Sequence, residues 1–456
     1  MRYVIACLLT LSFLPAQQPK PSIEGTWEGT IEAGPTKLKV GVTIARGADG
    51  ALSAKMDVPQ QGAIGLPLDD VTFEAGVLKF ALKMANGSYS GKLNDAGTEI
   101  SGTWVQGLPV PLVLKRVEKM ESPKRSQDPV PPYPYKSEDL TFTNPTAQIK
   151  LAGTLTLPEG KGPFPAVVLI TGSGPHNRDE ELMGHRPFLV LSDYLTRRGI
   201  AVLRYDKRGV GKSEGKLAEC TSEDFASDAQ AGWQYLRERK EIDPQRVGLL
   251  GHSEGGIIAP MAAAKNAGIA FIVMLAGDGV TGEQIIYKQT VLGLKAAGVP
   301  EATINQFTEL QKKAFDILRE EKDPQRMIER ISALPHPNGK DAAAAMAKAF
   351  ASPWYRFFAF YDPAPALEKV KCPVLALNGE LDTQVAFDQN LPAIEAALKK
   401  GGNKDYTVKA LPKLNHLFQT CQTGAVAEYS QIDETMSPVA LATIASWIRK
   451  TTHLDK

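Results

Sequence analysis

A short glycine-serine turn between an apolar run and a small-residue segment constrains the fold of this chain more than any other feature. Gly251-His252-Ser253-Glu254-Gly255-Gly256 follows the predicted strand 246–250 and opens the predicted helix 255–267. In that setting Gly-x-Ser-x-Gly predicts a nucleophile elbow, a turn so tight that the serine is lifted to the top of a sheet while glycine tolerates the crowding. The alternative is a glycine-rich turn that happens to contain a serine, since the bare pattern is common.

The length and charge of the chain limit its organisation and its partners. A chain of 456 residues is too long for one ordinary domain. The formal net charge is +1, which gives no electrostatic case for nucleic acid or for an anionic membrane surface. We therefore expect no nucleic acid partner; the partner expected from the motifs described below is a small-molecule ester or peptide-like substrate.

The first residues have the pattern of an export signal. Met1-Arg2 supplies a minimal positive region, and residues 3–14 form an apolar run that is short for a bilayer span. Cleavage after Ala16 would make residues 1–16 a secretory signal peptide and the mature protein secreted or periplasmic. A retained anchor or a buried N-terminal strand is the alternative. No later segment has the pattern of a membrane span, so we expect no integral span after signal removal.

Residues 22–118 predict a small all-β domain. Short alternating runs are separated by turn signals such as Asp49-Gly50 and Asn86-Gly87, which favours an up-and-down barrel or a sandwich. Gly25-Thr26-Trp27 recurs as Gly102-Thr103-Trp104, so two matching strands could close a barrel by pairing the first and last elements, unless the repeat is coincidence. The segment contains no histidine or cysteine, and its role cannot be inferred.

A proline-rich linker at 119–135 precedes an α/β domain at 136–456. Continuous apolar runs at 166–170, 200–205, 271–275 and 374–377 are typical of strands buried on both faces of a parallel sheet. Predicted helices alternate with them, which indicates a doubly wound, mostly parallel sheet. The alternation is interrupted at about 278–366 by a helical insertion placed where a lid would lie. Its aromatic run 354–360 either lines an apolar pocket or packs the lid onto the core.

A catalytic serine needs a base to take its proton and an acid to orient that base. His416 is the predicted base because it follows the last predicted strand, 406–411, in a loop that should lie beside Ser253. His336 lies between two prolines in the lid, and His453 is in the terminal tail, so neither fits as well.

The predicted acid lies on the loop that follows the apolar run 374–377. Asp382 is the first choice, and Glu380 on the same loop is the runner-up. Asp278, after the preceding strand, is a third candidate. An aspartate at such a place can also serve only to cap a helix or a turn.

An oxyanion hole requires two backbone N–H groups aimed at the developing negative charge. We expect one from Glu254, directly after the serine, and the other from Ser173, with Gly172 as its alternative. The Glu254 carboxylate, beside the nucleophile, is expected to form a salt bridge, with Arg178 or Arg208 as candidate partners.

Three segments carry a resemblance to a known family: Gly172-Ser173-Gly174-Pro175 with Asn177-Arg178-Asp179-Glu180, Asp206-Lys207-Arg208-Gly209-Val210-Gly211-Lys212-Ser213, and the elbow. Together they resemble the α/β-hydrolase superfamily, and within it bacterial esterases and serine-aminopeptidase-like (S33-type) hydrolases. The resemblance implies an α/β-hydrolase fold and a Ser-His-Asp triad. One departure is Thr171-Gly172, where many lipases carry His-Gly. The second segment lacks P-loop spacing and is predicted to be structural support for the site.

Three functions remain open from the sequence. The first is an exported serine hydrolase that cleaves carboxylic esters through Ser253, His416, Asp382 and an acyl-enzyme, with no metal or organic cofactor. The second is a peptidase or amidase acting on peptide-like substrates. The third is a ligand- or polymer-binding protein whose hydrolase activity is secondary.

Overall fold

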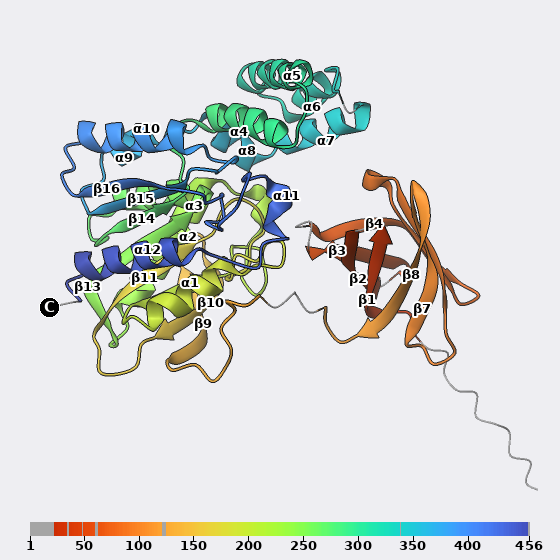
Figure 1. Cartoon of the computed structure of the whole chain (residues 1–456), viewed down its shortest axis with the longest axis horizontal. Helices are drawn as coiled ribbons and strands as arrows, with labels where there is room; N and C mark the ends of the chain where they lie inside the picture. Colours follow the sequence, from red (N-terminus) through yellow and green to blue (C-terminus); the bar gives the residue numbers. More distant parts are fainter. Residues whose placement is uncertain are drawn as a thin grey trace, which may run out of the picture. The chain divides into compact units, whose positions relative to one another are not determined.

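The chain forms two compact units, residues Met1–Ser122 and Pro123–Lys456 (Figure 1). The structure, a computed structural model, describes residues 22–33, 36–47, 49–59, 63–120, 125–337 and 339–454. The predicted signal peptide and residues 121–124 of the predicted linker lie outside the described residues. Within the described parts, none of the helices combines the length and apolar character needed to cross a bilayer.

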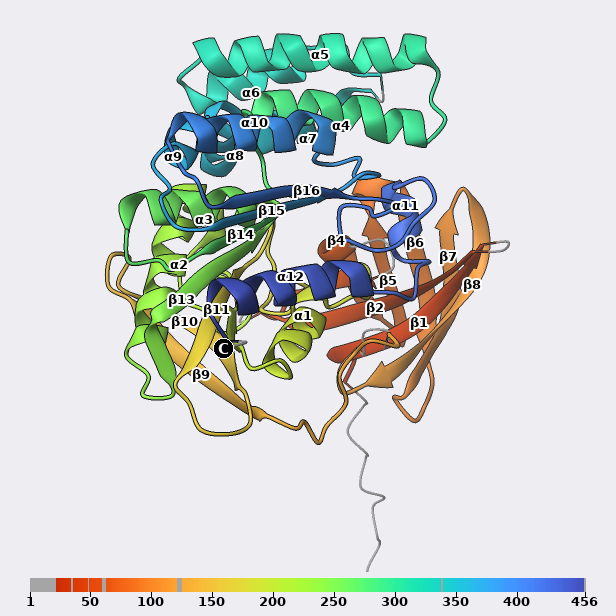
Figure 2. The same cartoon turned by 60° about the vertical axis from the view of Figure 1, so that its left-hand side comes forward.

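The first unit is a closed antiparallel barrel of eight strands, counted over the described residues (Figure 2). The strands are β1 (Gly25–Ala33), β2 (Thr36–Arg46), β3 (Leu52–Val58), β4 (Ala63–Glu74), β5 (Val77–Leu82), β6 (Gly87–Leu93), β7 (Glu99–Gln106) and β8 (Leu108–Val117). Each strand pairs with the next, and β1 closes the barrel on β8, with Trp27 opposite Arg116. Of the two predicted forms, barrel and sandwich, the structure has the barrel.

The two Gly-x-Trp strands do not pair with each other. Trp27 is fully buried on β1, whereas Trp104 lies on β7, between β6 and β8. A tight hairpin at Gly107, which has a positive φ of 84°, adds one further strand after the second motif. The predicted pairing of first and last strands therefore occurs, but through β8, and pairing of the two motifs was wrong.

The second unit contains an eight-stranded sheet in the order β16-β15-β14-β13-β11-β12-β10-β9, counted over the described residues. Its strands are β9 (Lys136–Asn144), β10 (Ile149–Leu157), β11 (Phe164–Ile170), β12 (Ala201–Tyr205), β13 (Ile242–His252), β14 (Ile272–Leu275), β15 (Val374–Gly379) and β16 (Tyr406–Leu411). β9, β10 and β12 pair antiparallel, and the remaining neighbours are parallel. The predicted mostly parallel sheet is confirmed.

Helices cover both faces of this sheet. One hydrophobic core joins the sheet to α2 (Ser222–Arg237), α3 (Glu254–Lys265) and α10 (Phe387–Lys400). A second core joins the opposite face to α1 (Pro187–Thr196) and α12 (Pro438–Thr451). Since the apolar strands are buried on both sides, the loops at their carboxyl ends remain available for binding and chemistry.

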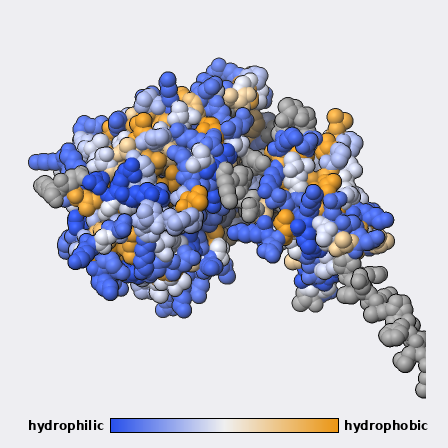
Figure 3. Space-filling view, turned by 60° about the horizontal axis from the view of Figure 1, so that its bottom comes forward, coloured by the Kyte–Doolittle hydropathy of each residue, from blue (hydrophilic) through white to orange (hydrophobic). Residues whose placement is uncertain are grey.

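A group of helices interrupts the alternation between β14 and β15, and in Figures 1 and 2 most of it stands at one end of the unit. Its members are α4 (Gly282–Ala296), α5 (Glu301–Glu320), α6 (Pro324–Ser332), α7 (Lys340–Phe350), α8 (Pro353–Phe360) and α9 (Ala364–Leu367). Four of them, α5 to α8, share a small core of their own around Phe315 and Phe350. We refer to α4–α8 as the lid. The face drawn in Figure 3 is mostly hydrophilic, with hydrophobic residues in small scattered groups.

Candidate active site

Ser253 stands at a strained turn between β13 and α3. Its φ of 53° and ψ of −119° lie in a region that a non-glycine residue adopts only when its surroundings impose it. The flanking glycines explain the strain, because a Cβ on Gly251 would overlap the carbonyl oxygen of Gly255. A Cβ on Gly255 would in turn overlap the carbonyl oxygen of Ile170. The turn therefore presents Ser253 at the carboxyl end of the central strand.

His416 and Asp382 lie together at the same edge of the sheet. The Nδ1 atom of His416 is 2.8 Å from Oδ2 of Asp382, and both side chains are almost completely buried. The other carboxylate oxygen, Oδ1, accepts hydrogen bonds from the backbone N–H groups of Gln384 and Val385, at 2.8 and 2.9 Å. The carboxylate is thus held so that the ring N–H of His416 can donate to it, which leaves Nε2 free of that contact.

The other candidates for base and acid lie elsewhere. The Glu380 side chain is exposed to solvent, and His453 is exposed in the C-terminal turn. His336 packs its ring edge-to-face against Phe307 in the lid, at 5.7 Å. Among the described residues, none makes a hydrogen bond with Ser253 Oγ, and catalytic pairs in free enzymes often lie too far apart for one.

Ser173 and Glu254, the predicted oxyanion donors, both line the pocket that contains Ser253. Glu254 is the first residue of α3, where N–H groups have no partner within the helix. The Gly172 N–H, the alternative donor, is already used, because it donates to Oε1 of Glu180 at 2.6 Å. Ser173, the next residue, lines the same pocket as Ser253. The geometry therefore favours the Ser173 N–H over that of Gly172.

The Glu254 carboxylate forms a buried ion pair, but with neither predicted arginine. Its Oε2 accepts from Nζ of Lys207 at 2.9 Å, and its Oε1 accepts from Ser222 Oγ and Trp354 Nε1 at 2.7 and 2.6 Å. Arg178 instead pairs with Asp206, and Arg208 with Asp228. Sequence order could not separate three neighbouring cations, and only Lys207 reaches the elbow.

A second buried pair, His252 and Glu180, lies next to the elbow. His252 places Nδ1 3.1 Å from Glu180 Oε1 and Nε2 3.0 Å from the carbonyl oxygen of His416. Both ring nitrogens face acceptors, which the protonated imidazolium satisfies. Burial by itself would lower the pKa of His252, but the charge and hydrogen bond of Glu180 raise it above its usual value. This pair fixes the backbone of His416 next to the elbow.

A cavity of about 230 Å³ opens at Ser253. The lid supplies its apolar wall, with Trp354, Tyr355 and Phe358 from α8 and two isoleucines from α4. Thus three of the aromatic residues in the run 354–360 line the pocket. Asp278 also lines it, 97% buried, and burial, followed by the nearby carboxylates of Glu254 and Asp382, raises its pKa well above the usual range.

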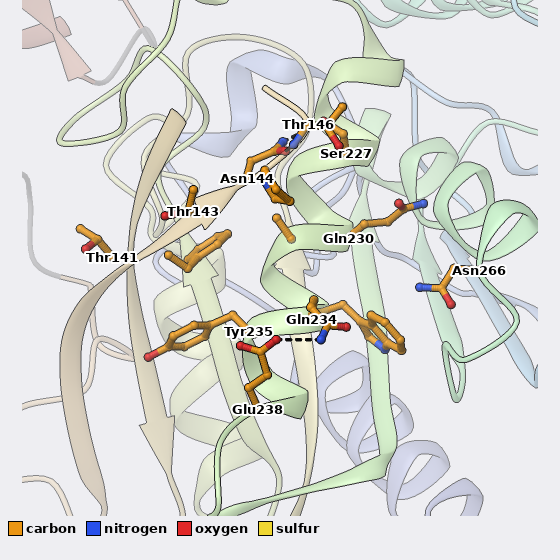
Figure 4. A pocket seen from close by; sticks show the side chains of 14 residues that line it. Thr141, Thr143, Asn144, Thr146, Ser227, Gln230, Gln234, Tyr235, Glu238 and Asn266 are labelled. Carbon is orange, nitrogen blue, oxygen red and sulfur yellow. Dashed lines mark hydrogen bonds between the residues drawn. The ribbon is translucent and has the colours of Figure 1, made fainter. Parts of the chain in front are cut away.

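A larger cavity of about 590 Å³ lies away from Ser253, against β9 and α2 (Figure 4). Most of the labelled side chains there are uncharged hydroxyls and amides, and Gln234 donates to Glu238 at 2.8 Å. In the described part of the chain no histidine or cysteine lines this cavity, so it shows no nucleophile paired with a base. Among the described residues, no cluster of three or more His, Cys, Asp or Glu side chains is arranged to hold a metal ion.

Comparison with known proteins places this site in a family. Residues 186–420, just over half of the chain, match the family described as serine aminopeptidase, S33. The chain belongs to this family. It is an α/β hydrolase, in agreement with the resemblance noted in its motifs, and the family match includes Ser253, Asp382 and His416.

Individual relatives extend this comparison. The chain is 29% identical to "Esterase EstD" of Thermotoga maritima over 351 residues, which cover 76% of this chain and 73% of that protein. It is 28% identical to the uncharacterized protein YfhR of Escherichia coli K12 over 145 residues, about half of the length of that relative. A solved α/β hydrolase, GrgF from a Penicillium species, matches 70% of this chain and 99% of its own at 16% identity, with a TM-score of 0.47.

Sequence reasoning missed the side chains that surround the predicted residues. Lys207, Glu180 and His252 stand within motifs that were recognised, but nothing in those motifs says which atoms they contact. Trp354 comes from a lid helix one hundred residues beyond the elbow. The one available signal was the segment 206–213, which was predicted to be structural support for the site without assigned partners.

Proposed function

We propose that this hydrolase is an exported enzyme that cleaves carboxylic esters through a Ser253-His416-Asp382 triad. The observation that carries the proposal is the buried 2.8 Å contact of His416 with Asp382 at the edge of the sheet where the strained elbow presents Ser253. The name of the relative EstD supports ester chemistry.

In this mechanism His416 removes the proton of Ser253 as Oγ attacks the ester carbonyl carbon. The tetrahedral intermediate places its negative oxygen against the N–H groups of Glu254 and Ser173. His416 then gives the proton to the departing alcohol, which leaves an acyl-enzyme on Ser253. Water, activated by the same histidine, attacks the acyl carbonyl and releases the acid. The charge of Asp382 stabilises the imidazolium in both steps.

The shape of the pocket favours esters with a small apolar group. A cavity of about 230 Å³ walled by Trp354, Tyr355 and Phe358 excludes water from one side of Ser253. Among the residues that the structure describes, no lysine or arginine lines it to pair with an anionic substrate. The expected substrate is therefore a neutral small-molecule ester.

A second candidate is cleavage of an amide or peptide bond. It is favoured by the presence of the Asp278 carboxyl in the pocket, where it could face a substrate amine, and it agrees with the description of the family. The chemistry on Ser253 would be the same, with an amine as the leaving group.

A panel of p-nitrophenyl acyl esters and aminoacyl p-nitroanilides tests the proposal on the wild type and on Ser253→Ala. We expect turnover of short-chain esters by the wild type and a loss of about 10⁴-fold or more in kcat for the variant. Turnover of the anilides alone would replace the ester proposal with the second candidate. Ester turnover that survives Ser253→Ala would refute the triad.

Export is part of the proposal, and it is supported by the basic and apolar pattern of residues 1–14. Expression of the full chain in a bacterium, followed by fractionation and N-terminal sequencing, would test it. We expect a mature N-terminus at Gln17 in the periplasm or medium, and an intact Met1 in the cytoplasm would contradict export.

A further inference from the structure

Lys207 joins the two segments that carry the oxyanion donors. Its Nζ donates to the carbonyl oxygen of Gly172 at 2.6 Å and to Oε2 of Glu254 at 2.9 Å. Gly172 precedes the donor Ser173, and Glu254 is itself the other donor. We call these three residues, Lys207, Gly172 and Glu254, the brace.

The contact with Gly172 fixes the direction of the Ser173 N–H. A trans peptide unit is planar, and its C=O and N–H point in opposite directions. The C=O of Gly172 and the N–H of Ser173 belong to one such unit. When Lys207 holds the oxygen on its own side, the N–H is directed away from Lys207, and Ser173 lines the pocket at Ser253.

The contact with Glu254 holds the other donor. The carboxylate accepts from Lys207, from Ser222 at the start of α2 and from Trp354 of α8, at 2.9, 2.7 and 2.6 Å. Three donors on one carboxylate leave little freedom for the first turn of α3, to which the Glu254 N–H belongs. Trp354 is also a wall of the pocket, so one hydrogen bond connects the lid to the residue whose N–H is the predicted donor.

The brace differs from an ordinary buried ion pair. The neighbouring Arg208 pairs with Asp228 of α2 at 2.6 Å and donates to the backbone of Asp224, and neither residue lies on an oxyanion segment. Lys207 and Glu254 are also buried, at 3% and 2% exposure, but Nζ of Lys207 contacts both segments that carry the predicted oxyanion donors.

We propose that Lys207 is a positioning residue that sets both backbone donors of the oxyanion hole, and that Trp354 of the lid completes this arrangement through Glu254. The inference rests on the proposed serine hydrolysis. Because its effect passes through the oxyanion, its loss should weaken stabilisation of the tetrahedral state and leave binding of the ground state unchanged.

The test compares Lys207→Met, Lys207→Arg and Trp354→Phe with the wild type and with Lys212→Met, an exposed lysine on the same loop. Each folded variant is titrated with a fluorophosphonate so that kcat refers to active molecules. We then measure kcat and KM on a p-nitrophenyl ester. We also measure inhibition by an alkylboronic acid, which forms a tetrahedral adduct with Ser253, and by the alcohol of the same chain length, which does not.

For Lys207→Met we expect kcat to fall by about 10-fold or more, with the boronic acid inhibition constant rising by a similar factor. KM and the alcohol inhibition constant should stay within about twofold of the wild type. Lys207→Arg keeps the charge but cannot place one compact ammonium on both acceptors, so it should show the same pattern. Trp354→Phe removes the indole N–H together with part of the pocket wall, so its boronic acid inhibition constant is compared with that of the alcohol, and kcat should fall by about threefold. Lys212→Met should match the wild type.

The proposal is overturned if folded Lys207→Arg and Trp354→Phe keep the kcat and the boronic acid affinity of the wild type. It is also overturned if binding of alcohol and boronic acid weakens equally, which would indicate general damage to the pocket. If Lys207→Met does not fold, the other two variants decide. Failure of the proposed function is a separate result, since it would appear as ester turnover by Ser253→Ala.

Discussion

At the scale of single residues, the two oxygens of Asp382 have separate tasks. Oδ1 is held by the N–H groups of Gln384 and Val385, and Oδ2 contacts the His416 ring. The carboxylate cannot rotate to offer either oxygen elsewhere without losing backbone hydrogen bonds in a buried environment. The orientation of His416 is therefore fixed by the loop that follows β15.

Asp382→Asn should keep the loop and the fold but disturb the proton balance of the triad. An amide that donates toward Nδ1 favours the tautomer of His416 that cannot accept a proton from Ser253, so we expect kcat to fall by about 10³-fold or more. The control is Glu380→Gln on the same loop, which should retain wild-type kcat. Equal losses in both variants would indicate that the loop, and not the acid, matters.

Asp278 should make the stability of the protein depend on pH. Its raised pKa means that the folded state keeps a proton that the unfolded state loses above about pH 4, so the free energy of unfolding falls as pH rises. Burial is the main cause of the raised pKa of Asp278, and the charges of Glu254 and Asp382 raise this pKa further. Asp278→Asn removes this titration.

We therefore compare the free energies of unfolding of Asp278→Asn and the wild type. The difference in favour of the variant should grow by roughly 1–3 kcal/mol between about pH 5 and about pH 8. Urea unfolding at both pH values measures it. A difference between the two proteins that stays constant with pH would show that Asp278 is ionised in the folded state.

At the scale of elements, the elbow depends on the absence of side chains. β13, α3 and the loop after β11 converge there, and a Cβ on Gly251 would overlap the backbone of Gly255. A Cβ atom added to Gly293 of α4 would meet no other atom, because the space around it is open. Alanine substitutions at Gly251 and Gly293 can therefore be compared to test how much the close packing at the elbow contributes to stability.

We expect Gly251→Ala to destabilise the protein by about 3 kcal/mol or more, because backbone must move to admit the methyl group. Gly293→Ala should stabilise it by about 0.5–1 kcal/mol, since alanine loses less entropy in a helix. Denaturant unfolding distinguishes them. Similar effects of the two changes would mean that the elbow is looser than its geometry indicates.

The parts of the fold that could be predicted from the sequence are those encoded by the residues of a single strand or helix. Apolar runs identified the strands β11 to β16 of the α/β sheet within a few residues of their observed bounds, whereas β9 was not predicted. The second Gly-x-Trp strand was misplaced because nothing in residues 102–104 reveals that Leu108–Val117 continues the barrel and closes it.

The candidate site shows the same limit. Ser253, Asp382 and His416 followed from chain order, because parallel strands bring their carboxyl ends to one edge. The partner of Glu254 did not follow, since Lys207, Arg178 and Arg208 are equivalent cations in the sequence. The run 354–360 was a candidate pocket wall, but the hydrogen bond from Trp354 to Glu254 could not be inferred, because it requires the lid to fold onto α3.

At the scale of the whole molecule, all side chains of the site come from the second unit, and the barrel has its own hydrophobic core around Trp27 and Trp104. Residues 123–456 should therefore hydrolyse p-nitrophenyl esters with a kcat within about threefold of the full chain. Steady-state kinetics on the two proteins measures this. Loss of activity in a folded fragment would assign the barrel a role in the chemistry.

The central claim is that Ser253 carries the acyl group during turnover. The most direct measurement is intact-protein mass spectrometry, with peptide mapping, after rapid acid quench of the enzyme with a slowly hydrolysed ester. The account predicts an added acyl mass on the peptide that contains Ser253 and none on Ser253→Ala. An unmodified Ser253 during measurable turnover, or an acyl group on another residue, would contradict it.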